Sequence, residues 1–156
     1  MSTENAISVE IPDKTIQDVL KLINDAEKLL NPFLVSLTAE QRKSIPKMAD
    51  GSEPFVMKVL DYCKSDPAYC PPFLDVVELE KDFKVVSQLS PLFRAISSLY
   101  DGVRDTKMLA GSESYVNSLT YYNTVKLAAK KNYGNAETIY DDLRVRFEAN
   151  GRRKSQ

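Results

Sequence analysis

Residues 76–110 have the sequence VVELEKDFKVVSQLSPLFRAISSLYDGVRDTKMLA. From Val86 onward its apolar residues recur at alternating steps of three and four, the spacing of a helix that packs against other helices. Six residues form this apolar seam: Val86, Leu89, Phe93, Ile96, Tyr100 and Val103. A helix of about 35 residues is about 52 Å long. We therefore expect a long central helix along which shorter helices pack.

Capping signals and helix breakers mark the other helices. Thr38-Ala-Glu-Gln41 and Asp75-Val-Val-Glu78 both match the capping box, which predicts a helix start at each position. Pro32 predicts a kink or break near Asn31. Three prolines between residues 67 and 72 favour extended backbone.

Within and after the central helix, proline and glycine predict interruptions. Pro91 is expected to bend the helix, since proline in a helix interior costs about 3 kcal/mol relative to alanine. Gly111-Ser112 is interpreted as a stop followed by a new cap, with the next helix running from Glu113 to about Lys131. Asn132-Tyr133-Gly134-Asn135 then breaks the chain before a last helix that begins at Ala136.

Together these patterns predict an all-α fold. We expect a four- to five-helix antiparallel bundle built on one long, kinked central helix at about 76–110, because short connections join antiparallel neighbours. Residues 1–12 are expected to be a flexible leader, 13–150 a single bundle domain, and 151–156 a basic disordered tail.

Net charge and hydropathy argue against a nucleic-acid or membrane partner. The formal net charge is −1, so no overall field attracts nucleic acid or an anionic membrane. No apolar run approaches the roughly 18 residues that span a bilayer. The N-terminus lacks the basic and apolar regions of a signal peptide, which predicts a cytoplasmic protein with no membrane partner.

Catalytic and metal signatures are absent from the sequence. The chain has no His, which removes the base that most often activates a serine and the usual ligand of di-iron bundles. Its glycines form no phosphate or dinucleotide loop. The many acidic residues are explained by solvated helix faces and favourable charge at helix N-termini. We therefore predict a protein that is not an enzyme and has no cofactor and no metal site.

The two cysteines, Cys63 and Cys70, are seven residues apart. That spacing does not match a zinc site, which needs closer pairs and further ligands. A buried thiol and a loop thiol are the simplest interpretation in a reducing compartment. A disulfide that closes an eight-residue loop and a redox role are the open alternatives.

One cluster suggests a ligand or partner patch. Arg104 and Asp105 precede the expected turn at Gly111, and Tyr115, Tyr122 and Lys126 follow it. Antiparallel packing of the two helices would bring these groups together, and tyrosine beside arginine suits a partner surface or a small polar ligand. The alternative is that the tyrosines are ordinary core residues.

The C-terminal region is basic. Between residues 144 and 156 five basic residues stand against one acid. A basic tail can contact nucleic acid or an acidic partner. Because the tail is short and lacks interleaved aromatic residues, we interpret it as a solubility feature and expect no nucleic-acid partner.

Four stretches carry a family resemblance: Ile45-Pro46-Lys47-Met48, Pro71-Pro-Phe-Leu-Asp-Val76, Ala110-Gly-Ser-Glu-Ser-Tyr-Val116 and Tyr121-Tyr-Asn-Thr-Val-Lys126. Together they resemble a family of small, uncharacterised bacterial α-helical proteins with no assigned activity. The resemblance covers about residues 29–147. It implies a bacterial, cytosolic, helical protein and nothing about mechanism.

These observations favour a non-enzymatic helical-bundle protein that binds another protein or a second copy of itself. The alternative is a bundle that binds a small ligand or a metal ion through internal carboxylates and tyrosines.

Overall fold

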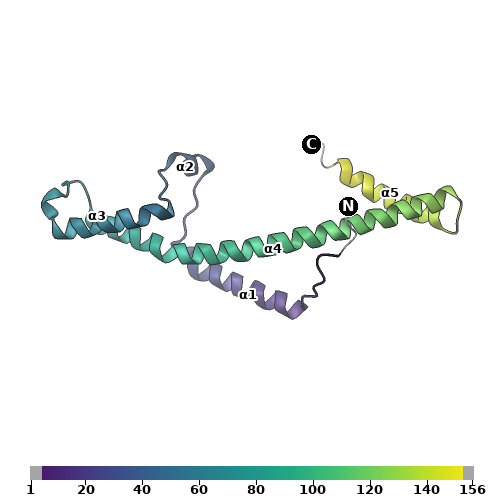
Figure 1. Ribbon diagram of the computed structural model, residues 1–156, viewed down its shortest axis with the longest axis horizontal. Coiled ribbons are helices and arrows are strands. Elements are labelled where there is room, and N and C mark those ends of the chain that lie inside the picture. Colours follow the sequence, from purple (N-terminus) through teal and green to yellow (C-terminus); the bar gives the residue numbers. More distant parts are fainter. Residues whose placement is uncertain (1–4, 153–156) are drawn as a thin grey trace. The chain divides into compact units, whose positions relative to one another are not determined.

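The computed structural model describes the backbone of residues 5–152 and the side chains of residues 5–49 and 51–148. All regular structure in this part of the chain is helical, with five α-helices, three short 3₁₀ helices and no strand (Figure 1). The all-α prediction is confirmed, and the number of α-helices in residues 5–152 agrees with it.

The chain divides into two units. Unit 1 consists of Met1–Ser8 and Leu99–Gln156, and unit 2 consists of Val9–Ser98. The boundary falls inside the longest helix, α4 (Val76–Lys130), which contributes residues to both units. This division does not test whether residues 13–150 fold as one domain, so the single-domain assignment stays a prediction.

Unit 2 begins with α1 (Asp13–Leu30), whose first helical residue is Asp13, with Pro12 in the capping position. The 3₁₀ helix η1 (Asn31–Phe33) follows directly and holds Pro32 near its start. The predicted break near Asn31 is therefore confirmed. None of the residues of α1 is buried.

The helix α2 (Ala39–Ser44) begins with the predicted capping box. The Thr38 hydroxyl accepts a hydrogen bond from the Gln41 amide at 3.1 Å, and the Gln41 side chain accepts one from the Thr38 amide at 2.9 Å. Two amides that would otherwise lack partners at the helix start are satisfied in this way.

After η2 (Asp50–Ser52), the helix α3 (Glu53–Ser65) runs antiparallel to the beginning of α4, as Figure 1 shows. Two contacts fix this direction. Lys64, near the end of α3, forms an ion pair with Glu80 at 2.7 Å, and Glu53, at its start, lies 3.1 Å from the Ser90 hydroxyl. Leu60 is buried between these two contacts.

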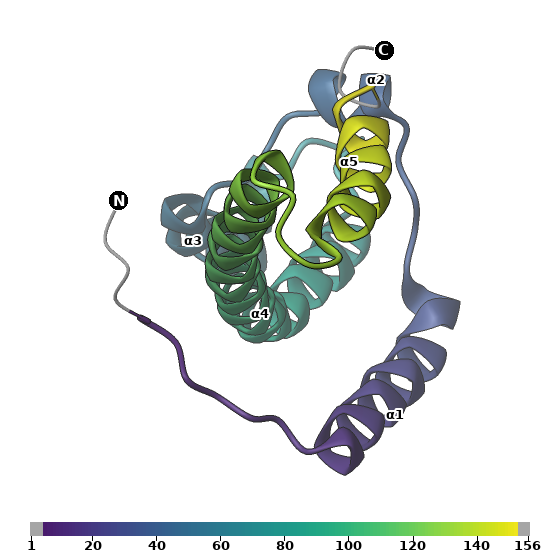
Figure 2. The same ribbon diagram turned by 90° about the vertical axis from the view of Figure 1, so that its right-hand side faces the viewer.

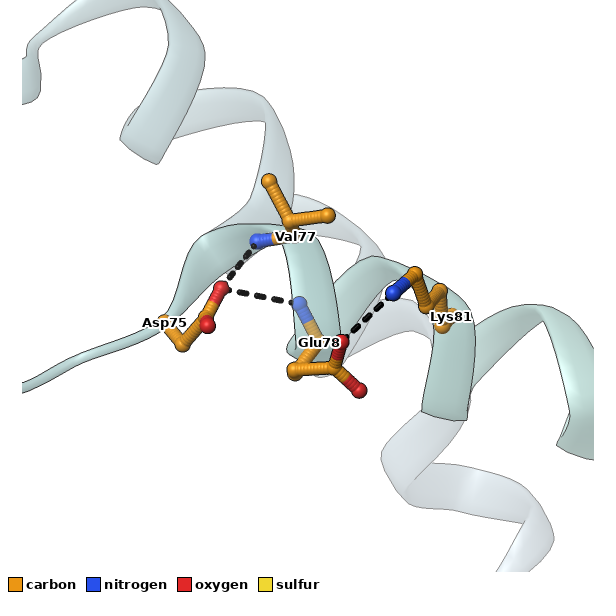
Figure 3. A network of polar contacts seen from close by, with 4 residues as sticks. All are labelled: Asp75, Val77, Glu78 and Lys81. Carbon is orange, nitrogen blue, oxygen red and sulfur yellow. Dashed lines mark hydrogen bonds and ion pairs between the residues drawn. The ribbon is translucent and has the colours of Figure 1, made fainter.

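The start of α4 is capped by Asp75. Figure 3 shows Oδ1 of Asp75 accepting hydrogen bonds from the amides of Val77 and Glu78, both at 3.0 Å. The predicted cap is confirmed. The Glu78 carboxylate does not complete the box, because it accepts a hydrogen bond from Lys81 instead.

The predicted end of this helix at Ala110 is wrong. α4 continues through Pro91, Gly102 and Gly111 to Lys130, a length of 55 residues. One glycine in a helix interior costs only about 1 kcal/mol relative to alanine, too little to end a helix whose other residues favour it. The helix is continuous through Pro91, and the kink predicted there stays a prediction.

α4 ends where Asn132-Tyr133-Gly134-Asn135 predicts a break. Asn132 adopts a left-handed φ of 53°. The amide of Tyr133 donates to the Ala128 carbonyl at 3.1 Å, and that of Asn132 donates to the Ala129 carbonyl at 3.0 Å. These two hydrogen bonds form a Schellman motif, which satisfies the last carbonyls of the helix.

The last helix, α5 (Ala136–Arg152), returns alongside the end of α4 within unit 1 (Figures 1 and 2). Val125 of α4 and Ala136 of α5 are the buried residues of this pair. The helix extends through Gly151 and Arg152, the first two residues of the predicted tail, and the disorder of that tail stays a prediction. The remaining tail residues, 153–156, lie outside the described residues.

Within its described residues, the N-terminal leader is hydrogen-bonded to α4 inside unit 1. The backbone amide of Ala6 donates to the Glu113 carboxylate at 2.7 Å. This hydrogen bond joins residues 107 positions apart in the sequence. Residues 1–4 of the predicted leader lie outside the described residues.

Candidate functional site

An open cavity of about 460 Å³ lies between α5 and the C-terminal part of α4. It is called the aromatic groove below. Its lining is Tyr115, Asn117, Ser118, Leu119, Tyr121, Tyr122, Leu143, Arg146 and Phe147. All of these residues belong to unit 1. Aromatic walls with a few polar groups are typical of small-ligand sites.

Tyr122 lies at the centre of the aromatic contacts. Its ring stacks on Phe147 with centroids 5.3 Å apart, and lies 5.5 Å from the Tyr140 ring. A hydrogen bond with Tyr140, and then burial, raise the pKa of Tyr122 above its ordinary value. The hydroxyl of Tyr122 is therefore protonated at neutral pH and can donate a hydrogen bond.

Arg146 supplies the positive charge of the groove. Its guanidinium contacts Asp142, one turn earlier on α5, through two hydrogen bonds of 3.3 and 3.2 Å. Hydrogen bonding to Asp142 raises the pKa of Arg146 further, so the guanidinium stays charged. The paired carboxylate holds the guanidinium in place, as bidentate pairs do.

The predicted patch is only partly assembled. Tyr115 and Tyr122 line the aromatic groove together, whereas Arg104 and Asp105 do not. The predicted packing of Arg104 and Asp105 against the two tyrosines is wrong, because the chain does not reverse at Gly111. Along one helix, Arg104 and Tyr122 are about 27 Å apart.

Arg104 has other partners on its own helix. Its guanidinium lies 3.1 Å from both Asp101 and Asp105 and 5.5 Å from the centroid of the Tyr100 ring. All of these side chains are exposed. Lys126 is exposed on α4 and is not part of the lining of the groove. Whether any of these residues binds a partner stays a prediction.

Arg146 is a groove residue that the predicted patch did not include. Tyr140, Leu143 and Phe147 recur at steps of three and four along α5, so this face can be predicted to meet another helix. The face of α4 that it meets depends on where the chain turns. The additional turn predicted at Gly111 directed attention to Arg104, because it would have placed Arg104 beside the tyrosines.

A second cavity, of about 500 Å³, lies in unit 2 and is called the thiol cavity below. It is lined by Val59, Tyr62, Cys63, Asp66, Tyr69, Cys70, Pro71 and Leu74. Both cysteines are free and half-buried. Of the predicted buried thiol and loop thiol, Cys63 lies in α3 and is only half-buried, and Cys70 lies in the loop after η3.

The later positions of the apolar seam form an exposed surface on α4. In unit 2, Phe93 is 71% exposed and Ile96 54%. In unit 1, Tyr100 is 62% exposed and Val103 60%. These four residues are called the exposed seam below. Val86 and Leu89, the earlier seam positions, are half-buried.

The described side chains, residues 5–49 and 51–148, include no group of three His, Cys, Asp or Glu that comes together as metal ligands would. None of the helices described there combines the length and apolar character needed to cross a bilayer.

Comparisons with known proteins add nothing to this description. No protein-family model, no curated protein and no solved structure matches the chain. The resemblance to uncharacterised bacterial helical proteins therefore stays a prediction.

Proposed function

We propose that this chain is a non-enzymatic helical protein that binds a second copy of itself through the exposed seam of α4. The single observation that carries the proposal is the exposure of Phe93, Ile96, Tyr100 and Val103, each more than half accessible on one helix. Isolated exposed apolar residues are common on protein surfaces, but a row at helix-packing spacing is not.

The spacing of the exposed seam argues for a helix as its partner. Steps of three, four and three residues place these side chains on one side of α4. Such a row packs into the matching spaces of another helix with the same repeat. A second copy of the chain offers that repeat on its own α4, and most homodimers use the same patch on both subunits.

The small core supports the same proposal. Among the residues whose side chains are described, only Leu60, Val125 and Ala136 are buried apolar residues. A chain of this length normally buries about two thirds of its surface on folding. Association would remove further apolar surface from water, which stabilises at about 25 cal/mol per Å².

The helix α1 offers additional apolar surface in unit 2. Ile16, Val19, Leu20 and Ile23 lie on one face of this helix and are all exposed. Association can cover this face as a second surface. The exposed seam of α4 remains the proposed primary contact.

We also place the protein in a bacterial cytoplasm as part of the proposal. The free thiols of Cys63 and Cys70 are compatible with a reducing compartment. The family resemblance of the turn and cap segments supports a bacterial source.

A second candidate function is the binding of a small aromatic ligand in the aromatic groove. The stacked rings of Tyr122 and Phe147 and the fixed guanidinium of Arg146 support this alternative. A metal-binding version, which the sequence left open, has no cluster of three ligands among the described side chains to support it.

Paired variants of α4 test the self-association. Ile96→Gln with Val103→Gln removes two exposed-seam side chains, and glutamine preserves helix propensity. Burial of each such side chain is worth about 1.5–3 kcal/mol, so the dimer dissociation constant should rise at least about 100-fold.

The matched control is Ala95→Gln with Ser98→Gln, two exposed positions of α4 outside the seam. It should leave the dissociation constant within about twofold of the wild-type value. Light scattering over a concentration series gives the dissociation constant of the wild type and of both variants. Equal weakening by both variants would show that the seam is not the contact.

A further inference from the structure

Cys63 and Cys70 lie next to each other in unit 2. Sγ of Cys70 is 3.8 Å from the backbone carbonyl oxygen of Cys63 and donates a weak hydrogen bond to it. Hydrogen bonding to the Cys63 side chain, followed by burial, raises the pKa of the Cys70 thiol. Cys70 therefore lies against Cys63, and both residues line the same cavity.

Local structure creates this proximity. Cys63 lies in the last turn of α3, and Cys70 directly follows the 3₁₀ helix η3 (Pro67–Tyr69). The amide of Asp66 donates to the Tyr62 carbonyl at 2.8 Å, and that of Cys70 donates to the Pro67 carbonyl at 3.0 Å. These hydrogen bonds turn the chain back toward α3, so the pair is a property of the fold and not only of the seven-residue spacing.

The thiol cavity gives a small reagent access to the pair. Its volume is about 500 Å³, and Tyr62, Tyr69 and Leu74 are among the residues that line it. Both cysteines are half-buried, so neither thiol is sealed from solvent. An isolated thiol that reacts with a small disulfide stops at a mixed disulfide. A second thiol beside it can attack that mixed disulfide and complete the exchange.

We propose that Cys63 and Cys70 form a dithiol site that reduces low-molecular-weight disulfides and is itself converted to an intramolecular Cys63–Cys70 disulfide. This site is independent of the exposed seam on α4. Its substrate class is a small, solvent-borne disulfide that fits an open cavity of this volume.

The reaction balances in two exchange steps. In the first, one cysteine loses its proton and its thiolate attacks a sulfur of the small disulfide. The small S–S bond breaks, a protein–small-molecule mixed disulfide forms, and the departing thiolate takes up a proton.

In the second step the other cysteine loses its proton, and its thiolate attacks the protein sulfur of the mixed disulfide. That bond breaks, the Cys63–Cys70 bond forms, and a second small thiol leaves with a proton. The protein loses two electrons and two protons, and the small disulfide gains both.

Titration of the full chain with mixtures of reduced and oxidised glutathione tests the proposal. Samples are quenched, unfolded, alkylated with iodoacetamide and weighed by mass spectrometry. Under oxidising mixtures we expect the mass of a single chain with no alkyl group and no glutathione attached. Cys63→Ser and Cys70→Ser should each accumulate one glutathione adduct instead.

The same titration in urea separates the fold from the sequence spacing. If η3 brings the thiols together, the equilibrium constant for disulfide formation should be at least about tenfold higher in the native protein than in urea. Equal constants in the two conditions would overturn the proposal. So would a wild-type protein that carries two glutathione adducts, retains two alkylated thiols, or forms a disulfide between two copies.

Discussion

The ring of Tyr122 on α4 stacks on the ring of Phe147 on α5, with centroids 5.3 Å apart and an angle of 21° between the ring planes. Tyr140 lies beside the same ring at 5.5 Å. The two helices that end the chain are therefore joined by aromatic contacts at the centre of the aromatic groove. Loss of either stacked ring should loosen this pair.

A double-mutant cycle measures the stacking. Tyr122→Leu, Phe147→Leu and the double variant should give a coupling energy of about 0.5–1.5 kcal/mol beyond the loss of buried area. Urea unfolding gives the free energy of unfolding of the wild type, the two single variants and the double variant. The cycle of Tyr115→Leu with Phe147→Leu is the control, since no ring stacking joins that pair in the described residues. Equal coupling in both cycles would contradict the assignment.

Gly111→Ala tests the continuity of α4. Helical alanine is more stable than helical glycine by about 1 kcal/mol, and a Cβ at position 111 would meet no atom within 4 Å. We expect a gain of about that size in the free energy of unfolding. A turn at Gly111 with left-handed backbone would produce a loss instead.

Gly134→Ala is the contrasting variant. Gly134 has a φ of 55° in the loop between α4 and α5, a conformation that alanine adopts at a cost. Strain of about 1–2 kcal/mol should lower the free energy of unfolding. Opposite signs for the two glycine variants in urea unfolding would support the helix bounds, and matching signs would contradict them.

Asp75→Ala removes the cap of α4. The carboxylate accepts hydrogen bonds from two amides at the helix start, so its loss should destabilise unit 2 by about 1 kcal/mol. Asp82→Ala, at an exposed position inside the helix, serves as the control. Urea unfolding followed by circular dichroism compares the two. A smaller loss for Asp75→Ala than for Asp82→Ala would contradict the role of the cap.

The ion pair of Lys64 and Glu80 predicts a pH dependence. Hydrogen bonding to Lys64 lowers the pKa of Glu80 below its ordinary value of 4.5. The stabilisation is therefore present above pH 4.5 and is lost as the pH falls through the lowered pKa. At the alkaline end, hydrogen bonding to Glu80 raises the pKa of Lys64, so the pair persists beyond pH 10.5.

Melting temperatures of the wild type and of Glu80→Gln, measured across the acid range, check this dependence. The wild type should melt higher at neutral pH, and the difference should disappear at a pH well below 4.5. Both side chains are more than half exposed, so high salt should also shrink the difference. A difference that persists unchanged in strong acid would rule out the ion pair as its source.

Local signals in the sequence predicted local structure well. The caps at Thr38 and Asp75, the break at Asn31-Pro32 and the end of the helix before Asn132 all involve residues within four positions of one another. Hydrogen bonds and steric limits at that range depend little on the rest of the chain.

The error at Gly111 has a physical explanation. A glycine followed by serine is compatible with both a helix stop and a helix interior. A real stop also needs the left-handed residue and the two returning hydrogen bonds that are found at Asn132 and Tyr133. Sequence alone predicted a stop at both glycine-containing segments and did not show that Gly111 lacks these features.

The candidate site depended on that choice. Because an additional turn was expected at Gly111, Arg104 was expected beside Tyr122, whereas Arg146 is the arginine that lines the groove with it. The proximity of Cys63 and Cys70 was also unpredictable, since it depends on the turn that η3 makes through a proline-rich segment. Contacts between separate helices need the geometry of the turns, which periodicity does not encode.

Sedimentation equilibrium of the full chain over a wide concentration range tests the central claim most directly. Self-association through the exposed seam predicts a weight-average mass that rises with concentration from 17.6 kDa toward twice that value. Ile96→Gln with Val103→Gln should shift this rise to higher concentration. A mass of 17.6 kDa at every concentration of the wild type would contradict the proposed function.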